Sequence, residues 1–482
     1  MNVTIVDYGM GNLSSVAKAF ETLGVDVVVS SKPDAIASAE RIVLPGVGAF
    51  GEGMDNLRRF GLIGPLEEAV RIRRKPFLGI CLGMQLLAHE GFEHGHHDGL
   101  GWVAGAVKPF EVDGARFKSI HIGWNHVVPR WQEPFFTGLE NSQTFYFVHG
   151  YHLICETPQT IYATSRYGQP FVSSICQDNI FGVQFHPEKS QEAGLALLHN
   201  FLRWDPTTPV AGRSLEGRED GVVPPNVRLI PTLSLWRGRL VKTVKFAIVH
   251  AGLRRDVGDP VKAPMVYDAQ LADELIYLDI RASLEGRDST QVRHVVSEVA
   301  GQIFMPLTAG GGITTLHEIR ALLQAGADRV AINSAAVEQP SFITEAAETF
   351  GRQCLVVSID AKLVGPGRYE VFTHSGTKAT GLDPVRWARQ AAEAGAGELL
   401  LTSIDRDGTM VGYDLSLIRA VSGAVNIPVI ASGGAGTLHD LAQGVAEGRA
   451  SAIAAASLFH FRDLSPIKAK AFLRRAGLPI RT

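Results

Sequence analysis

The sequence predicts an α/β protein of two domains, an N-terminal domain built on a mostly parallel sheet and a C-terminal (β/α)₈ barrel. Three observations carry this prediction. Short apolar strands alternate with amphipathic helical patterns over residues 1–204, and the alternation resumes from residue 226 to 482 with eight strand-like runs. Residues 205–225 are rich in Pro, Gly and charge and show no periodicity, so we interpret them as a linker.

In the first domain, residues 3–6, 27–29 and 41–44 are strand-like runs rich in β-branched residues. The most informative stretch is residues 76–88, where an apolar run ends at Cys81 between two glycines and a helical pattern follows. A strand, a tight turn and a helix in this order are typical of a nucleophile elbow. We expect the N-terminus of that helix to face the sulfur and to favour the thiolate.

A reactive cysteine needs a base, and residues 181–188 supply a candidate. An apolar strand runs into His186, and Glu188 follows two residues later, on the same side if the segment is extended. His186 can then take the thiol proton while Glu188 fixes its tautomer. The competing interpretation is a buried cysteine and a loop histidine that never meet.

Two other patterns in this half point to ligands. Gly9 and Gly11 follow the first strand but lack the third glycine and the downstream acidic residue of a dinucleotide site. Residues 93–98 crowd three histidines with two acidic side chains, yet such polar, Gly-containing loops are usually just solvated. We therefore expect neither a cofactor nor a metal.

Composition narrows the class of protein. The chain has 482 residues, 45% of them hydrophobic, and a net charge of −3, which argues against nucleic acid or an anionic membrane as partner. No apolar run approaches the ~20 residues of a membrane span. Four cysteines are too few for a disulfide framework. We expect a cytoplasmic protein.

The barrel prediction rests on eight strands that end in polar or glycine-rich turns, at residues 227–231, 275–279, 305–312, 330–333, 355–360, 399–403, 429–434 and 452–456. There is an internal repeat, because the Gly310 turn recurs 123 residues later at Gly433 and Glu274 recurs 124 residues later at Glu398. The barrel is therefore expected to consist of two half-barrels. Glycine turns expose backbone amides, so we expect two phosphates on opposite sides of the mouth. The alternative is that these glycines simply terminate strands.

At residue level the first 204 residues resemble the triad-type, class-I glutamine amidotransferases. The motifs that carry the resemblance are residues 79–85 and 186–188, and residues 6–12, 45–48 and 123–125 narrow it to the glutaminase of imidazole glycerol phosphate synthase. The resemblance implies a flavodoxin-like sheet and a glutamyl thioester on Cys81, from which ammonia is released. It also implies that the backbone of Gly46 and Val47 binds the oxyanion and that Gln85 contacts the substrate glutamine.

The barrel is similar to the cyclase half of the same family, so the chain resembles a fused glutaminase and synthase. The family resemblance implies that ammonia passes through the barrel to a bis-phosphorylated substrate at the far mouth. We expect L-glutamine and this phosphorylated small molecule as the ligands, with the fused domains acting as an internal complex. Residues implied to bind the phosphorylated substrate are Lys242, Asp279, Gly311, Gly312, Asn333, Asp407, Gly433, Gly434 and Ser457.

The resemblance further implies an ammonia entrance ringed by charge, matched here by Arg228, Glu274, Arg329 and Glu398, with lysine usual in the family at position 329. Asp328 and Lys189 match the pair that holds the family's two halves together.

One position departs from the family pattern. The family's cyclase uses two aspartates for acid–base work; Asp360 matches one, but Ser234 stands where the other belongs. A serine hydroxyl cannot exchange protons near neutral pH as a carboxylate does, and losing a general acid or base typically costs about 10²–10⁴-fold in rate. The family also has glycine where Thr243 stands, and residues 246–258 are longer than usual.

Three interpretations therefore stay open. The chain is an imidazole glycerol phosphate synthase in which Asp360 alone, or Asp407, performs the proton transfers. It is instead similar to a diverged branch whose ammonia serves amidination or amination of a sugar in surface polysaccharide synthesis. The least favoured alternative is a regulatory partner without catalysis, against which the intact Cys81, His186 and Glu188 argue.

Overall fold

The computed structural model describes residues 1–114, 117–140, 143–208, 226–246, 255–286 and 289–481. It divides into two compact units, one made mainly of residues 1–225 and the other mainly of residues 226–482. The division falls at Asn226, where the barrel was expected to begin. Most of the predicted linker, and residues 247–254 of the lengthened loop, lie outside the described residues.

The first unit is built on a nine-stranded sheet. Five parallel strands stand in the order β2-β1-β3-β4-β13, the strand order of a flavodoxin-like sheet. The sheet then continues antiparallel through β12, β11, β8 and β9. The parallel strands are β1 (Asn2–Val6), β2 (Asp26–Ser30), β3 (Arg41–Gly46), β4 (Phe77–Cys81) and β13 (Ile180–Val183); the antiparallel ones are β8 (His121–Pro129), β9 (Gln143–His149), β11 (Ile161–Tyr167) and β12 (Gln169–Gln177).

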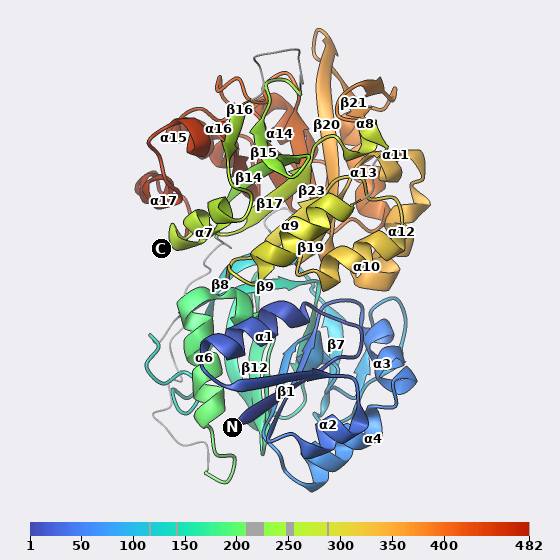
Figure 1. Ribbon diagram of the computed structural model, residues 1–482, viewed down its shortest axis with the longest axis vertical. Coiled ribbons are helices and arrows are strands. Elements are labelled where there is room, and N and C mark those ends of the chain that lie inside the picture. Colours follow the sequence, from blue (N-terminus) through green and yellow to red (C-terminus); the bar gives the residue numbers. More distant parts are fainter. Residues whose placement is uncertain (115–116, 141–142, 209–225, 247–254, 287–288, 482) are drawn as a thin grey trace. The chain divides into compact units, whose positions relative to one another are not determined.

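Helices pack against this sheet, and α1 and α6 lie side by side (Figure 1). The apolar residues of α1 at Val16, Ala19 and Phe20 are buried, as a helical period of 3.6 requires of a face that covers a sheet. The helices and turns are α1 (Leu13–Thr22), α2 (Pro33–Ser38), α3 (Phe50–Arg59), α4 (Ile63–Leu66), the π-helical η1 (Glu67–Ile72), α5 (Leu82–Gln85), η2 (Pro158–Thr160), η3 (Pro187–Lys189) and α6 (Gln191–Arg203).

A second, four-stranded sheet of order β10-β7-β5-β6 was not predicted. Its strands are β5 (Glu90–Gly91), β6 (His97–Asp98), β7 (Gly105–Pro109) and β10 (Tyr151–Cys155). The histidine-rich loop forms part of it, where Nε2 of His96 lies 2.8 Å from Oε2 of Glu90. Among the described residues no group of three or more His, Cys, Asp or Glu side chains is arranged to hold a metal ion.

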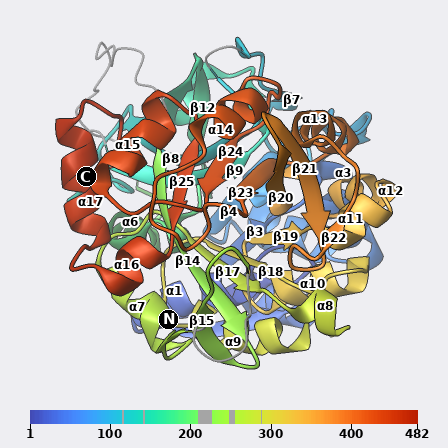
Figure 2. The ribbon, with the colours of Figure 1, turned by 90° about the horizontal axis from the view of Figure 1, so that it is seen from above.

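The second unit is a closed parallel barrel of eight strands in the order β14-β17-β18-β19-β20-β23-β24-β25, completed by pairing of β14 with β25. This confirms the predicted barrel. The strands lie inside a ring of helices (Figure 2). The barrel strands are β14 (Arg228–Trp236), β17 (Leu275–Asp279), β18 (Leu307–Gly310), β19 (Arg329–Ile332), β20 (Leu355–Gly365), β23 (Glu398–Ser403), β24 (Val429–Ser432) and β25 (Ala452–Ala455).

The barrel interior is apolar, with Ile230, Ile276, Val356 and Ile430 among its buried residues. Short strands extend two barrel strands at the mouth: β15 (Arg239–Lys242) and β16 (Arg255–Gly258) follow β14, and β21 (Arg368–Thr373) and β22 (Lys378–Ala379) follow β20. The helices are α7 (Lys262–Ala269), α8 (Ala282–Glu285), α9 (Thr290–Ala300), α10 (Leu316–Gln324), α11 (Ser334–Glu338), α12 (Ser341–Phe350), η4 (Arg352–Cys354), α13 (Pro384–Ala394), α14 (Leu415–Ser422), α15 (Leu438–Ala446), α16 (Ser457–Phe461) and α17 (Pro466–Arg475).

The two halves of the barrel repeat each other at matched helix starts. Thr315 caps α10 in a capping box with Glu318, and Thr437 caps α15 in a capping box with Asp440. Each box follows a glycine turn at a strand end, so the repeat seen in the sequence is also a repeat of local structure.

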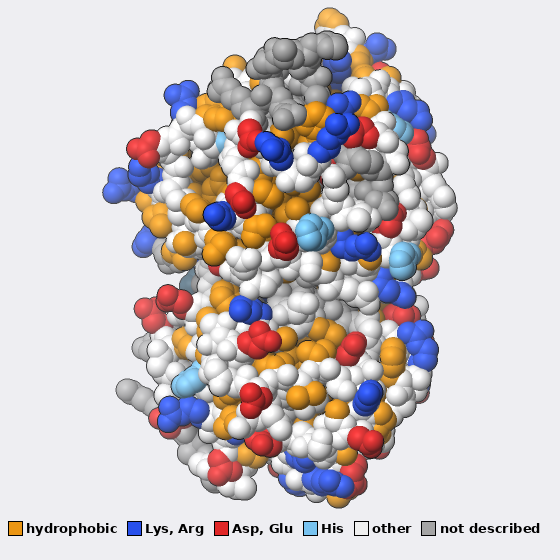
Figure 3. Space-filling view, in the orientation of Figure 1, with side chains coloured by type: hydrophobic (Ala, Val, Ile, Leu, Met, Phe, Trp, Pro, Cys, Tyr) orange, Lys and Arg blue, Asp and Glu red, His pale blue; other side chains and the backbone are white. Residues whose placement is uncertain are grey.

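The charge distribution on the described surface agrees with the small net charge of the sequence. On the face shown in Figure 3, Lys and Arg side chains are interspersed with Asp and Glu, so this face has no extended area of one sign among its described residues. In the described part of the chain, no helix combines the length and the apolar character needed to span a bilayer.

Candidate active sites

The nucleophile elbow forms at the end of β4. Cys81 is buried and adopts φ 52° and ψ −107°, a conformation that a non-glycine residue holds only when its surroundings impose it. Gly46 at the end of β3 pairs with Cys81 across the sheet. The sequence therefore correctly placed the cysteine on a strained turn at the carboxyl edge of parallel strands.

The helix that follows is shorter than the sequence predicted. It ends at Gln85, because the carbonyls of Leu86, Leu87 and Ala88 accept hydrogen bonds from the amides of residues 100–103 instead of continuing the helix. A single helical turn has only a small dipole, so the expected contribution of α5 to the thiolate is correspondingly small.

His186 and Glu188 form a buried pair. Nδ1 of His186 lies 2.8 Å from Oε1 of Glu188, and both side chains are almost wholly inaccessible. We had expected an extended segment between the two residues, but the structure has a 3₁₀ turn over Pro187–Lys189. Proline favours the first position of such a turn because its φ is fixed and it has no N–H to leave unpaired.

The charge state of His186 depends on two neighbours. Burial acts to lower the pKa of His186, but the interactions with Cys81 and Glu188 raise it well above its ordinary value. The second ring nitrogen, Nε2, is buried and makes no conventional hydrogen bond to a described residue. The histidine is thus suited to hold a proton as imidazolium next to the cysteine.

Gly46 and Val47 directly follow the apolar part of β3 and lie beside the elbow. A Cβ atom on Gly46 would lie 2.3 Å from the hydroxyl oxygen of Tyr8 and 2.9 Å from Cβ of Leu82, so only glycine fits there. Backbone amides at such a close approach can bind a developing oxyanion. The Tyr8 hydroxyl, which the sequence did not single out, is buried and has no hydrogen-bond partner among the described residues.

Gln184 is the second residue that the sequence did not single out. Its Nε2 donates to Sγ of Cys81 over 3.6 Å, and its Oε1 accepts from Nε2 of Gln85 at 3.1 Å. The alternation of a strand, which places residues i and i+2 on one side, could have grouped Gln184 with His186. Gln85, expected to contact substrate, uses both hydrogens of its amide within the protein, since it also donates to the Tyr151 carbonyl at 2.9 Å.

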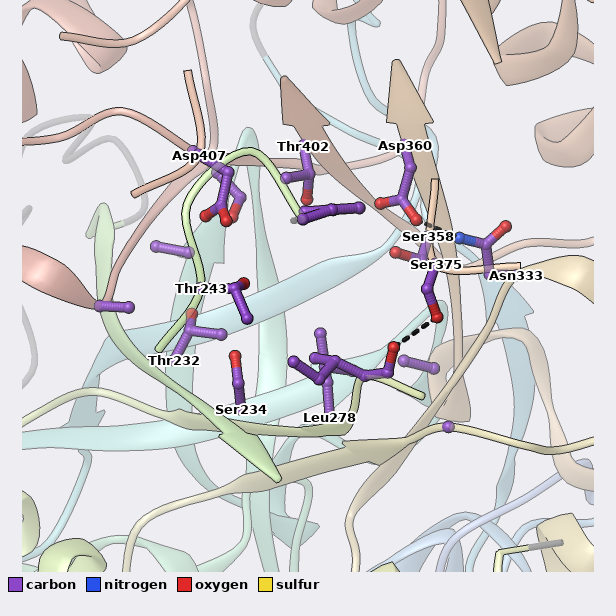
Figure 4. A pocket seen from close by; sticks show the side chains of 18 of the residues that line it. Thr232, Ser234, Thr243, Leu278, Asn333, Ser358, Asp360, Ser375, Thr402 and Asp407 are labelled. Atoms are coloured by element: carbon purple, nitrogen blue, oxygen red, sulfur yellow. Dashed lines mark hydrogen bonds between the residues drawn. The ribbon is translucent and has the colours of Figure 1, made fainter. Parts of the chain in front are cut away.

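The barrel mouth holds a second candidate site, a pocket of about 150 Å³. Every residue that we expected to bind the phosphorylated substrate lines this pocket, namely Lys242, Asp279, Gly311, Gly312, Asn333, Asp407, Gly433, Gly434 and Ser457. Ser234 and Asp360 line it too, and they point into it from opposite sides (Figure 4). The strand ends thus gather these residues at the carboxyl edge of the barrel, where such folds place their active sites.

Asp360 is buried at the mouth and accepts a 2.6 Å hydrogen bond from Nδ2 of Asn333. Burial raises the pKa of Asp360 to about 7; the Asn333 hydrogen bond opposes this increase and the charge of Asp407 adds to it. A carboxyl that titrates near neutral pH can act as general acid or base.

Lys242 is held by Asp407, another acidic residue of the pocket. Its Nζ lies 2.8 and 3.0 Å from the two carboxylate oxygens of Asp407. Ser234 is opposite Val241 in the register of β14 and β15, so the serine is one strand away from this ion pair. Thr243, which replaces the family's glycine, also lines the pocket.

The two glycine turns share one matched backbone position, Gly311 in the first half and Gly434 in the second. Gly311 has φ 116° and Gly434 has φ 112°, both in the region that favours glycine. A Cβ atom on Gly311 would lie 2.4 Å from the Asp279 carbonyl oxygen, and one on Gly434 would lie 2.2 Å from the Gly412 carbonyl oxygen. Such turns expose the backbone amides that phosphate oxygens require.

At the opposite end of the barrel, the four charged residues of the expected entrance form one closed ring. Arg228, Glu274, Arg329 and Glu398 begin or precede strands β14, β17, β19 and β23, and none exposes more than 1% of its surface. Arg228 lies 2.9 Å from Glu274, and each arginine contacts both glutamates. Charges alternate around the ring, so it is neutral overall.

The expected pair of Asp328 and Lys189 spans the two units. Within the barrel, Asp328 accepts a 2.8 Å hydrogen bond from the backbone amide of Leu307. Its pairing with Lys189 stays a prediction.

Two comparisons with known families agree with this geometry. Residues 4–204 match the family described as glutamine amidotransferase class-I. Residues 228–465 match the family described as histidine biosynthesis protein.

Proposed function

Because this chain fuses a class-I glutamine amidotransferase domain to a barrel domain of the histidine biosynthesis protein family, we propose that it is a bifunctional imidazole glycerol phosphate synthase. Glutamine is hydrolysed in the first domain, and its ammonia is delivered to a bis-phosphorylated ribonucleotide in the barrel. The products of the barrel reaction are imidazole glycerol phosphate and the aminoimidazole carboxamide ribotide. The observation that carries the proposal is the pocket at the barrel mouth, which combines Lys242, Asp360 and two glycine turns.

The glutaminase step follows from the elbow. The Cys81 thiolate attacks the amide carbon of glutamine, and the amides of Gly46 and Val47 stabilise the oxyanion that forms. His186 donates its proton to the leaving nitrogen, which departs as ammonia and leaves a glutamyl thioester. The neutral imidazole then takes a proton from water, whose attack on the thioester releases glutamate and restores the thiolate.

The barrel step uses the two halves of the mouth. We propose that one phosphate binds at Gly311 and Gly312 and the other at Gly433 and Gly434, because both turns line the pocket and each has a glycine of matching φ, Gly311 and Gly434. Lys242 supplies a positive charge to the pocket for a phosphate. Its partner Asp407 neutralises this charge until substrate binds. Asp360 is the candidate acid and base, because it titrates close to neutral pH.

Ammonia is proposed to enter through the ring of Arg228, Glu274, Arg329 and Glu398. The ring is closed by ion pairs, so passage requires one of them to break. Lys189 and Asp328 are proposed to hold the two domains together. We also infer a cytoplasmic location, because a catalytic thiol works in a reducing compartment.

Channelling has a direct test. The protein is supplied with the bis-phosphorylated ribonucleotide, amide-¹⁵N-glutamine and an excess of unlabelled ammonium. Retention of ¹⁵N in imidazole glycerol phosphate is the expected result, because channelled ammonia does not mix with the solvent pool. Label diluted to the solvent value would contradict an internal path.

Ser234 favours one alternative acceptor. Since the second catalytic aspartate is absent, the barrel could instead pass ammonia to a sugar substrate for amidination or amination in surface polysaccharide synthesis. The glutaminase chemistry is the same in both cases. A regulatory role without catalysis is the least supported alternative, because Cys81 lies at the end of β4, His186 follows the end of the paired strand β13, and Glu188 contacts His186.

A further inference from the structure

Gln184 connects the nucleophile to a set of buried polar groups that the triad does not use. Its side chain is fully buried, and its Nε2 donates to Sγ of Cys81. Beyond Gln184 lie Gln85, the Tyr151 carbonyl, His149, His121 and Asn125, and we call these groups the Gln184 network.

The carbonyl oxygen of Tyr151 fixes the direction of the network because it can only accept. Gln85 must therefore present its amide nitrogen to this oxygen, at 2.9 Å. The second hydrogen of the same nitrogen points to Gln184, which must present its oxygen, at 3.1 Å. The amide nitrogen of Gln184 is thereby turned toward the sulfur of Cys81.

The same carbonyl fixes the two histidines. Nδ1 of His149 lies 2.8 Å from it and must carry a proton, and in the neutral imidazole Nε2 of His149 accepts from Nδ1 of His121 at 3.0 Å. Nε2 of His121 in turn accepts from Nδ2 of Asn125 at 3.2 Å.

This arrangement of donors and acceptors requires both imidazoles to be neutral. Burial lowers the pKa of His149 to about 3, and burial followed by the neighbouring His149 lowers the pKa of His121 well below its ordinary value. Each member of the network thus has one possible orientation, and every orientation directs a donor toward the next acceptor.

We propose that Gln184 is a further residue of the glutaminase centre, whose amide N–H stabilises the Cys81 thiolate and orients its sulfur. The Gln184 network is the scaffold that keeps this donor in place, with His149 as a positioning residue. A hydrogen bond to the charged form of an acid favours that form, and a donor held by buried neighbours needs no reorganisation when substrate arrives. The inference rests on the proposed role of Cys81 as nucleophile, but its test does not require turnover.

The test measures the rate at which iodoacetamide alkylates Cys81, followed on the Cys81 peptide by mass spectrometry from pH 5 to pH 10. Gln184→Glu keeps the shape and still accepts from Gln85, but has no N–H for the sulfur. Gln184→Met also removes the donor and adds no charge. We expect the midpoint of the alkylation profile to move up by about one pH unit in both variants.

Gln177→Glu is the matched control, because it makes the same exchange on β12 at a side chain that donates to the Trp102 carbonyl. Its alkylation profile should equal that of the wild type. If Gln184→Glu does not fold, Gln184→Met decides. A wild-type profile in the folded Gln184 variant would overturn the proposal.

Variants of His149 test whether the Gln184 network keeps the Gln184 donor in place. His149→Ala should shift the alkylation profile in the same direction, whereas His149→Asn should restore it in large part, because its amide can still donate to the Tyr151 carbonyl. Equal profiles for wild type and His149→Ala would assign the histidines a structural role only and overturn that part. If the wild-type protein hydrolyses no glutamine with any barrel ligand, but the Gln184 variants still shift the alkylation profile of Cys81, the proposed function fails and this inference stands.

Discussion

The Nδ1 atom of His186 lies 2.8 Å from Oε1 of Glu188, across a turn that begins with Pro187. This contact leaves Nε2 of the imidazole to face the cysteine, and the two acidic neighbours, Cys81 and Glu188, raise the pKa of His186 against the effect of burial. The first domain therefore brings the cysteine next to a histidine that a carboxylate holds in place.

Replacing Cys81 by Ser should abolish the use of glutamine, because a serine hydroxyl is a far weaker nucleophile at neutral pH. The reaction of the barrel with added ammonium salts should persist, since this change is confined to the first unit. Product formation with glutamine and with ammonium, measured side by side, checks both expectations. Loss of both activities in a folded variant would count against separate glutaminase and synthase sites.

Replacing Ser234 by Asp places a carboxyl opposite Asp360, at the position where the family has its other catalytic aspartate. If the barrel cyclises the bis-phosphorylated ribonucleotide, we expect this variant to form product about 10²-fold faster, the lower end of what a general acid or base contributes. Thr232→Asp is the matched control, because Thr232 lies two residues earlier on β14 and also lines the pocket. Unchanged turnover in Ser234→Asp would favour the alternative acceptor.

Asp360 should make the barrel less stable as pH rises. Its carboxyl pKa is raised from 3.8 to about 7, so between these values the unfolded chain loses a proton that the folded chain keeps. Stability then falls by up to about 1.4 kcal/mol per pH unit over this window and is flat above it.

Asp360→Asn should remove this pH dependence. The free energies of unfolding of variant and wild type are measured at pH 5 and at pH 8, and the difference between the two proteins is compared at the two pH values. Asp463→Asn, at an exposed side chain, serves as control. If Asp360→Asn and wild type show the same difference at both pH values, the carboxyl does not titrate near 7.

The charged ring should couple the two reactions. Glu398→Gln leaves Arg228 and Arg329 with one carboxylate between them, and we expect glutamate to form in excess over imidazole glycerol phosphate. Breaking a buried ion pair on one side also destabilises a fold by about 3–5 kcal/mol, so a control with similar damage is needed.

Lys470→Met provides that control. Nζ of Lys470 lies 2.6 Å from Asp273, which also binds Arg481, in a second buried ionic cluster of the barrel. This variant should lose stability and keep the ratio of glutamate to product. A ratio near one in Glu398→Gln would show that the ring does not control the passage of ammonia.

The sequence was sufficient for the architecture because its signals are long and periodic. Eight apolar runs with glycine-rich ends predicted the barrel, and the run into Cys81 predicted the elbow. The sheet of β10, β7, β5 and β6 was missed, since strands such as β5 and β6 have only two residues each and carry no periodic pattern. The expected extended segment at His186 was wrong because Pro187 favours a turn.

The sequence likewise singled out some residues of the candidate sites and missed others. The glycine turns could be named from local patterns and Lys242 from the family resemblance, and the structure places them in one pocket. The sequence did not single out Gln184 and Tyr8, because their importance arises from contacts between strands that are distant in the sequence. Strand alternation could have grouped Gln184 with His186, but not with the sulfur of Cys81. Tertiary packing, rather than local pattern, decides which buried polar group faces the sulfur.

The most direct test of the central proposal is to incubate the wild-type protein with glutamine and the bis-phosphorylated formimino-aminoimidazole ribonucleotide and to quantify three products. We predict equal amounts of glutamate, imidazole glycerol phosphate and the aminoimidazole carboxamide ribotide, with Ser234 tolerated in the pocket. Glutamate without the imidazole product, or no turnover at all, would contradict the histidine-pathway proposal and direct the search to another ammonia acceptor.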